Sequence, residues 1–101
     1  MSKSEFAQAY TERMFPDIAA PAGYIDPEFE VLFDNFAFDE VITEEGRNVS
    51  AKDRFLAILA TLVGASAVDE YALMLPAALN FGLIPDEVVE LIYQAVPYLG
   101  I

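Results

Sequence analysis

Hydrophobic residues recur along the chain at intervals of three and four positions, the spacing of one face of an α-helix. This period predicts five helices, over residues 3–15, 26 to about 44, 50 to about 65, 66–82, and from 85 until Pro97 and Gly100 interrupt the pattern. No stretch alternates apolar and polar residues as a half-buried strand does. The predicted fold class is therefore all-α, a helical bundle of about five helices.

Residues that favour helix ends stand at the predicted boundaries. Asp26 precedes Pro27, and proline suits the first helical position because its missing N–H is not needed there. Ser50 and Ser66 each stand three residues before an aspartate, as in a capping box. Gly82 is predicted to stop the fourth helix, because glycine readily adopts the left-handed conformation that follows a helix end.

The third predicted helix is apolar on nearly every side. A helix of this kind is buried on every side, so we expect it to be the central helix, and one that a partner subunit could share. Its uncharged run, residues 55–68, has 14 residues. A membrane span needs about 20 mostly apolar residues, so the run is interpreted as core rather than as a membrane segment.

Two features bear on domains and assembly. A stretch rich in proline after residue 15 suggests a boundary, which divides the chain into an N-terminal helix with its loop, residues 1–25, and a main helical domain, residues 26–101. Of the 101 residues, 55% are hydrophobic. A small monomer cannot easily hide so much apolar surface, so we expect a homo-oligomer.

Charge and composition exclude several functions. Seventeen acidic residues against five basic ones give a net charge of −12, which disfavours nucleic acid and anionic membranes as partners. The chain has neither cysteine nor histidine. Thiol chemistry, histidine catalysis and a tight zinc or iron site are therefore not expected, and we predict no metal and no cofactor. A cytoplasmic location is the default interpretation.

Several blocks of sequence, in order, resemble one known family. They are FAFDEV (36–41), VSAKDRFLAILATLVG (49–64) and PAALNFGLIPDEVVELIYQAVPYLG (76–100). The chain resembles the carboxymuconolactone decarboxylase family, part of the wider AhpD-like group. The resemblance implies an AhpD-like helical fold, assembly as trimers, hexamers or dimers, and a small-molecule ligand.

The same resemblance shows where this chain departs from its relatives. The peroxidase branch of the AhpD-like group works through a Cys-x-x-Cys pair, and this chain has no cysteine, so a thiol peroxidase activity is not expected. The decarboxylase branch usually has a histidine three residues before the alanine that matches Ala77. Here that position is Met74, which can neither transfer a proton at neutral pH nor anchor a carboxylate.

Two polar residues of the family pattern are kept, and they are the candidate catalytic residues. Glu40 lies in the aromatic-x-Glu-Val motif, where burial in a pocket would raise its pKa and suit it to proton transfer. Arg54 heads the third helix, where its guanidinium could hold a substrate carboxylate or form a structural ion pair with Glu40 or Asp53. Glu40 is otherwise a surface glutamate among other acids.

Three further residues, Tyr71, Met74 and Tyr98, are candidates to bind substrate. The alternatives are ordinary: tyrosines on apolar helices are often core residues with surface hydroxyls, and methionine often fills a core gap. Two functions stay open. The chain is either a cofactor-free lyase that processes a small carboxylate or lactone, or a catalytically degenerate module of the same fold that serves in oligomerisation or small-ligand binding. Whether it is an enzyme is left undecided at this point.

Overall fold

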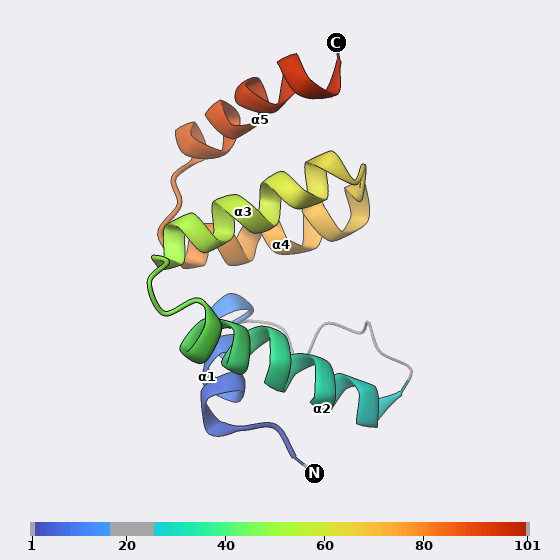
Figure 1. Cartoon of the computed structure of the whole chain (residues 1–101), viewed down its shortest axis with the longest axis vertical. Coiled ribbons are helices and arrows are strands. Elements are labelled where there is room, and N and C mark those ends of the chain that lie inside the picture. Colours follow the sequence, from blue (N-terminus) through green and yellow to red (C-terminus); the bar gives the residue numbers. More distant parts are fainter. Residues whose placement is uncertain (1, 17–25, 101) are drawn as a thin grey trace. The chain divides into compact units, whose positions relative to one another are not determined.

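The computed structural model describes residues 2–16 and 26–100, and within these ranges it is all-α (Figure 1). The expectation of an all-α fold is confirmed. Five α-helices and one π-helix follow in order: α1 (Glu5–Met14), α2 (Pro27–Asn35), η1 (Phe36–Glu45), α3 (Ala51–Gly64), α4 (Val68–Asn80) and α5 (Pro85–Leu99).

Packing divides the chain into two compact units, residues 1–48 and residues 49–101. The first unit holds α1, α2 and η1, and the second holds α3, α4 and α5. Each unit has buried hydrophobic residues of its own. The proposed boundary near residue 25 stays a prediction, and most of the proline-rich loop falls outside the described residues.

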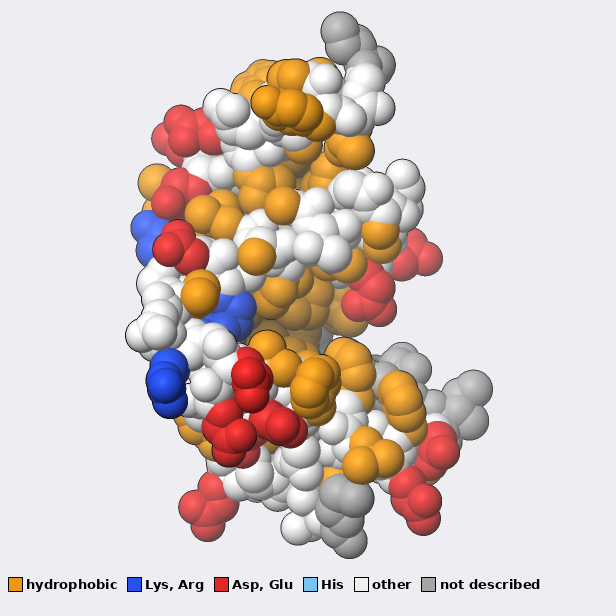
Figure 2. All heavy atoms as spheres, viewed as in Figure 1, with side chains coloured by type: hydrophobic (Ala, Val, Ile, Leu, Met, Phe, Trp, Pro, Cys, Tyr) orange, Lys and Arg blue, Asp and Glu red, His pale blue; other side chains and the backbone are white. Residues whose placement is uncertain are grey.

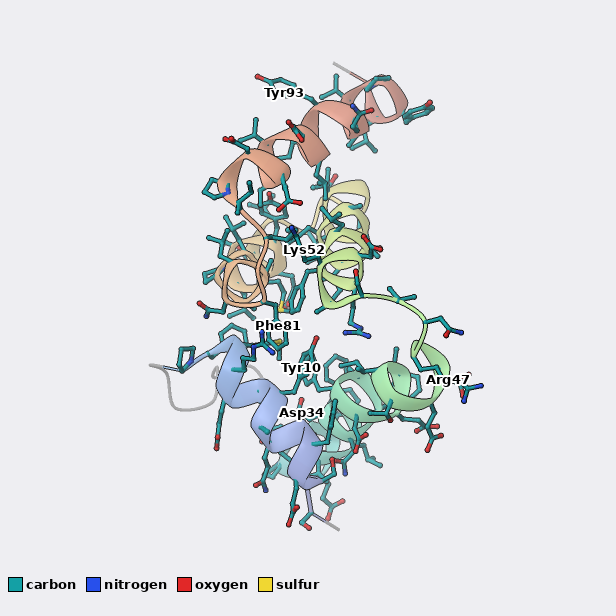
Figure 3. The ribbon with its side chains drawn as sticks, turned by 90° about the vertical axis from the view of Figure 1, so that its left-hand side faces the viewer. Tyr10, Asp34, Arg47, Lys52, Phe81 and Tyr93 are labelled. Carbon is teal, nitrogen blue, oxygen red and sulfur yellow. The ribbon has the colours of Figure 1, made fainter. Side chains whose placement is uncertain are left out.

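Helix α1 packs against η1 in the N-terminal unit. Ser4 caps it, since the Ala7 N–H donates to the Ser4 hydroxyl oxygen at 3.0 Å. Its buried face is made of Ala7, Tyr10 and Met14. Tyr10 stacks on Phe38 of η1, with ring centroids 5.8 Å apart (Figure 3 labels Tyr10). This aromatic contact joins the first helix to the segment that carries the family motif.

Polar contacts from the first residues bind the start of the chain to α2. The Lys3 ammonium lies 2.9 Å from an Asp34 carboxylate oxygen and 3.3 Å from Glu30. The Ser4 backbone N–H donates to the Asn35 side-chain oxygen at 2.7 Å. Asp34 is buried, and Figure 3 shows it against the N-terminal helix. A buried carboxylate needs such a partner, because an unpaired buried charge is costly.

The predicted second helix begins as expected and then changes type. Asp26 caps α2 by accepting the Glu28 N–H at 3.0 Å, and Pro27 opens it. From Phe36 the α-helical hydrogen-bond pattern gives way to that of the π-helix η1, which ends before Gly46. A Cβ on Gly46 would lie 2.7 Å from the Val41 carbonyl oxygen, so glycine is required there. The apolar period alone does not distinguish an α-helical turn from the wider π turn.

Helices α3 and α4 form the centre of the C-terminal unit. Ser50 caps α3 as predicted, since the Asp53 N–H donates to its hydroxyl oxygen at 3.1 Å. Phe55 and Leu59 are fully buried, and Phe55 packs on Phe81 with centroids 4.9 Å apart. The expectation that α3 is buried on every side is wrong, because one face, which includes Ala57, is exposed.

The predicted Ser66 cap of the fourth helix is also wrong. Ser66 has φ 56°, its N–H donates to the Val63 carbonyl, and the Ala67 N–H donates to Leu62. This pair of bonds is a Schellman motif, so Ser66 closes α3 instead of opening α4. Helix α4 starts at Val68 after an Ala67 cap that offers no side-chain acceptor.

Helices α4 and α5 each contain an interior proline, and neither proline ends its helix. Helix α4 continues through Pro76 to Asn80, and Gly82 follows at φ 105°, so the predicted glycine stop is confirmed. Helix α5 also continues past Pro97, and the predicted interruption there is wrong. The helix continues beyond this proline to Leu99, and the Gly100 N–H donates to the Val96 carbonyl at 2.9 Å.

Candidate functional sites

Glu40 lies on the π-helix η1 of the N-terminal unit, and its side chain is exposed. Its neighbour Asp39 accepts a hydrogen bond from the Ser4 hydroxyl at 2.6 Å, and Phe38 stacks on Tyr10. The turn that carries Glu40 is therefore fixed on both sides, while Glu40 itself projects from it. π-helical segments occur frequently at functional sites, because the wider turn changes which side chains share a face.

Arg54 lies in the first turn of α3, in the C-terminal unit, and is half-buried. Its guanidinium donates from Nη2 to the Val49 carbonyl at 3.4 Å. Within the described residues Arg54 forms no ion pair, so most of its donors are available to a ligand. Glu40 and Arg54 belong to different units, and their convergence on one site stays a prediction.

The three candidate substrate-binding residues lie in the C-terminal unit. Tyr71 and Met74 are half-buried on α4. The Tyr71 hydroxyl is buried and meets no hydrogen-bond partner among the described residues. Tyr98 lies near the end of α5 and is 90% exposed. Their roles toward a substrate remain predictions.

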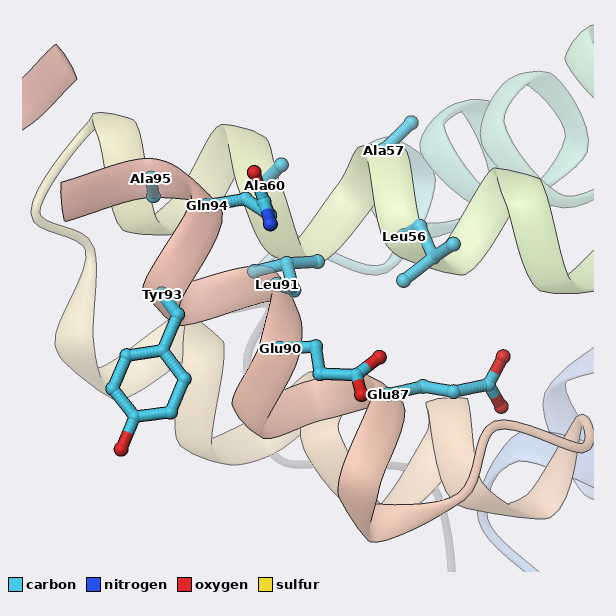
Figure 4. A pocket seen from close by; sticks show the side chains of 9 residues that line it. All are labelled: Leu56, Ala57, Ala60, Glu87, Glu90, Leu91, Tyr93, Gln94 and Ala95. Carbon is cyan, nitrogen blue, oxygen red and sulfur yellow. The ribbon is translucent and has the colours of Figure 1, made fainter. Parts of the chain in front are cut away.

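The C-terminal unit contains a concave site that the sequence did not indicate. An open groove of about 840 Å³ runs between α3 and α5, and we call it the α3–α5 groove (Figure 4). The α3–α5 groove is lined partly by apolar and small side chains and partly by polar ones. The apolar and small residues are Leu56, Ala57, Ala60, Leu91 and Ala95, and the polar residues are Glu87, Glu90, Tyr93 and Gln94. None of the five predicted site residues is among them.

The position of this groove follows from local sequence. Ala57 and Ala60 are exposed on α3, and their small side chains leave space where larger residues would touch α5. Leu91 lies over that space, and Gln94 flanks it (Figure 4). The signal in the sequence is a pair of alanines three apart opposite an amphipathic helix. That signal is weak, because alanine in a helix is usually chosen for helix propensity.

The groove carries negative charge on one side. Glu87 and Glu90 lie along α5 at its mouth (Figure 4). The Ile84 N–H donates to the Glu87 carboxylate at 3.1 Å, and Lys52 forms an ion pair with it at 3.1 Å. These two contacts, the Ile84 N–H first, lower the pKa of Glu87 below its usual value. Glu87 is therefore ionised at neutral pH.

The arrangement limits what the groove can do chemically. Its lining offers carboxylates, one amide and one phenol as polar groups, and the one cation described beside it, Lys52, is paired with Glu87. A ligand carboxylate would meet like charge there, whereas an amine or a hydrogen-bond donor would meet acceptors. An apolar floor with a few polar groups at its rim is typical of a small-molecule site.

Comparison with models of known protein families gives one match for this chain. The family model described as "Carboxymuconolactone decarboxylase family" matches residues 27–101. The chain belongs to the carboxymuconolactone decarboxylase family. The matched range includes η1 with Glu40 as well as the whole C-terminal unit, so the family pattern covers both candidate sites. No curated protein and no solved structure gives a match. Over the described residues, this family member has no helix long and apolar enough to cross a membrane.

Proposed function

We propose that this member of the carboxymuconolactone decarboxylase family binds a small amphipathic molecule, neutral or cationic, in the α3–α5 groove. The observation that carries the proposal is the groove itself, an apolar floor from Leu56 and Leu91 beside the carboxylates of Glu87 and Glu90. The volume of about 840 Å³ lies within the range of small-molecule sites.

Support for binding rather than turnover comes from the groups at the groove. Glu87 is already engaged by the Ile84 N–H and by Lys52, so its lowered pKa makes it a poor proton donor at neutral pH. The chain has no histidine or cysteine, so the groove has neither an imidazole nor a thiol beside Glu87. The ligand is accordingly held by apolar contact and by attraction to the acidic rim.

The experiment is a benzylamine titration followed by amide resonances in two-dimensional NMR. Ala60→Leu places a larger side chain on the groove floor, and we expect it to abolish the saturable shifts of α3 and α5 resonances. Ala72→Leu is the matched control, because Ala72 is also exposed on a helix but lies on α4, away from the groove lining. Equal binding by both variants would contradict the proposal.

A second function is favoured by a separate observation, the placement of Glu40 on a π-helix and the uncommitted donors of Arg54. The candidate is a lyase for a small carboxylate or lactone. Loss of CO₂ from such a substrate leaves an electron pair on carbon, and Glu40 would deliver the proton to it. Arg54 would hold a carboxylate through paired N–H donors.

The test of this second function follows the decarboxylation of carboxymuconolactone. Glu40→Gln removes the transferable proton and should lower turnover about 10²–10⁴-fold, the usual contribution of general acid–base catalysis. Glu44→Gln is the matched control, since Glu44 is an exposed acid on the same π-helix. Full activity in Glu40→Gln, or equal losses in both variants, would exclude Glu40 from the chemistry.

A further inference from the structure

The α3–α5 groove has a charged end and an apolar end. Glu87 and Glu90 lie near the start of α5, and Ala60 and Ala95 lie farther along the groove (Figure 4). Figure 2 shows a similar division on the surface, with acidic side chains over the first turns of α5 and hydrophobic ones over its later turns. A ligand that fits this division has its charge near the start of α5 and its apolar part beyond it.

The two carboxylates at the charged end differ in the contacts that they already make. The Ile84 N–H donates to Glu87 at 3.1 Å, and the Lys52 ammonium lies 3.1 Å from the same carboxylate oxygen. Glu90 is exposed, and within the described parts of the chain it forms neither a hydrogen bond nor an ion pair. Glu90 is therefore the carboxylate that is open to a ligand.

The contacts of Lys52 show where an ammonium group is held at this end of the groove. Its side chain reaches from the first turn of α3 to Glu87 on α5 (Figure 3 labels Lys52). A Cβ on Gly82 would lie 3.9 Å from the Lys52 Cγ, so the stem of the lysine passes close to the turn before α5. The position beside Glu87 is therefore filled by a cation of the chain itself.

We propose that Lys52 makes the groove selective for a small monoamine, whose ammonium group pairs with Glu90 while Lys52 keeps Glu87. This inference rests on the function proposed above, and it names the class of ligand and the residue that binds its charge. The ammonium donates hydrogen bonds to the Glu90 carboxylate, and the apolar part of the ligand contacts Leu91 and Ala60. A second ammonium on the same ligand would have to displace Lys52 from Glu87, so a diamine gains little over a monoamine.

The first experiment tests Glu90 by benzylamine titration of the whole chain, followed by amide resonances in two-dimensional NMR. Glu90→Gln keeps the size of the side chain and removes its charge, and we expect it to weaken binding by up to about fivefold, the range of an exposed ion pair. Asp86→Asn is the matched control, since it removes the same charge from an exposed residue of α5 that does not line the groove. Equal affinities of the two variants would overturn the role of Glu90.

The second experiment tests Lys52 by comparing benzylamine with para-xylylenediamine, which adds a second aminomethyl group to the same ring. In the wild-type chain the two affinities should agree, apart from the statistical advantage of two equivalent ammonium groups. Lys52→Met frees Glu87, and the diamine should then bind up to about fivefold more tightly than benzylamine, because each of its ammonium groups meets a carboxylate. Arg47→Met is the matched control, since it removes a positive charge from an exposed position outside the groove lining. An unchanged ratio of affinities in Lys52→Met would overturn the role of Lys52.

The results also separate this inference from the function on which it rests. If benzylamine causes no saturable shifts of α3 and α5 resonances in the wild-type chain, the groove is not an amine site and both proposals fail. If benzylamine binds there and the diamine already binds the wild-type chain far more tightly, the groove remains an amine site, and its selectivity for monoamines is excluded.

Discussion

The two units of this chain differ in the contacts found inside each of them. In the N-terminal unit, polar contacts link residues far apart in sequence: Lys3 with Asp34, and Ser4 with both Asn35 and Asp39. In the C-terminal unit, fully buried aromatic and aliphatic residues form the core, and the ion pair between Lys52 and Glu87 is largely exposed. The sequence alone therefore does not show how much a charged residue or a helix cap contributes to stability. That contribution depends on how buried the contact is and on whether it links residues far apart in the chain.

The strongest effect is expected in the apolar core. Phe55→Ala should lower the free energy of unfolding by about 3–5 kcal/mol, because the cavity cannot close around a fully buried ring that packs on Phe81. Phe36→Ala is the control on the other unit, since Phe36 is mostly exposed and should cost no more than about 0.5 kcal/mol. Urea unfolding measures both, and similar losses would contradict the assigned core.

Next comes the polar core of the N-terminal unit. Asp34→Asn should cost about 2–3 kcal/mol, less than a fully buried pair, because the Lys3 side chain keeps 19% exposure and its contact with Glu30. Glu12→Gln, an exposed acid on α1, provides the comparison and should change little. If urea unfolding gave Asp34→Asn the smaller effect, the N-terminal unit would not depend on this pair.

Removing the serine cap of the N-terminal unit, Ser4, should lower stability more than removing the cap of the C-terminal unit, Ser50. Ser4→Ala removes the acceptor for the Ala7 N–H and also the hydrogen bond to Asp39, so a loss of about 2 kcal/mol is expected. Ser50→Ala removes only the cap on the Asp53 N–H, with a loss of about 1 kcal/mol. Thermal unfolding of both variants provides the check, and a larger loss at Ser50 would reverse the comparison.

The smallest effects concern pH. The contact with Asp34 raises the pKa of Lys3, so its stabilisation is complete below pH 10.5 and is lost as pH rises through the raised pKa. The pKa of Glu87 is lowered, so its stabilisation is present above pH 4.5 and is lost as pH falls through the lowered pKa. Differences between wild-type and variant unfolding curves should show the alkaline effect in Asp34→Asn and the acid effect in Glu87→Gln. If the difference in the free energy of unfolding between wild type and variant stayed constant across the alkaline range for Asp34→Asn, or across the acid range for Glu87→Gln, the pH effect assigned to Lys3 or to Glu87 would be contradicted.

Much of the fold could be predicted from sequence because its signals are local. The caps at Asp26 and Ser50 and the stop at Gly82 each act within a few residues of themselves. The prediction fails at Ser66 because the same serine pattern fits a helix start and the left-handed closure of α3. It fails at Pro97 because an interior proline removes a single hydrogen bond and need not end the helix, as α5 continues to Leu99.

The candidate sites were less accessible to sequence reasoning. The family pattern identifies Glu40, but the apolar period cannot show that its helix is of the π type. The α3–α5 groove depends on Ala57 and Ala60 facing α5 across space, which only tertiary packing reveals. Glu87 and Glu90 look like ordinary acids at a helix start until the groove beside them is known.

The decisive property of the α3–α5 groove is its preference for a ligand of one charge. The measurement compares benzylamine with benzoate, two probes of similar size, in NMR titrations of the whole chain. We predict saturable shifts along α3 and α5 with benzylamine, and none there with benzoate, because Glu87 and Glu90 border the groove. Benzoate binding in the groove as tightly as benzylamine would contradict the proposed function.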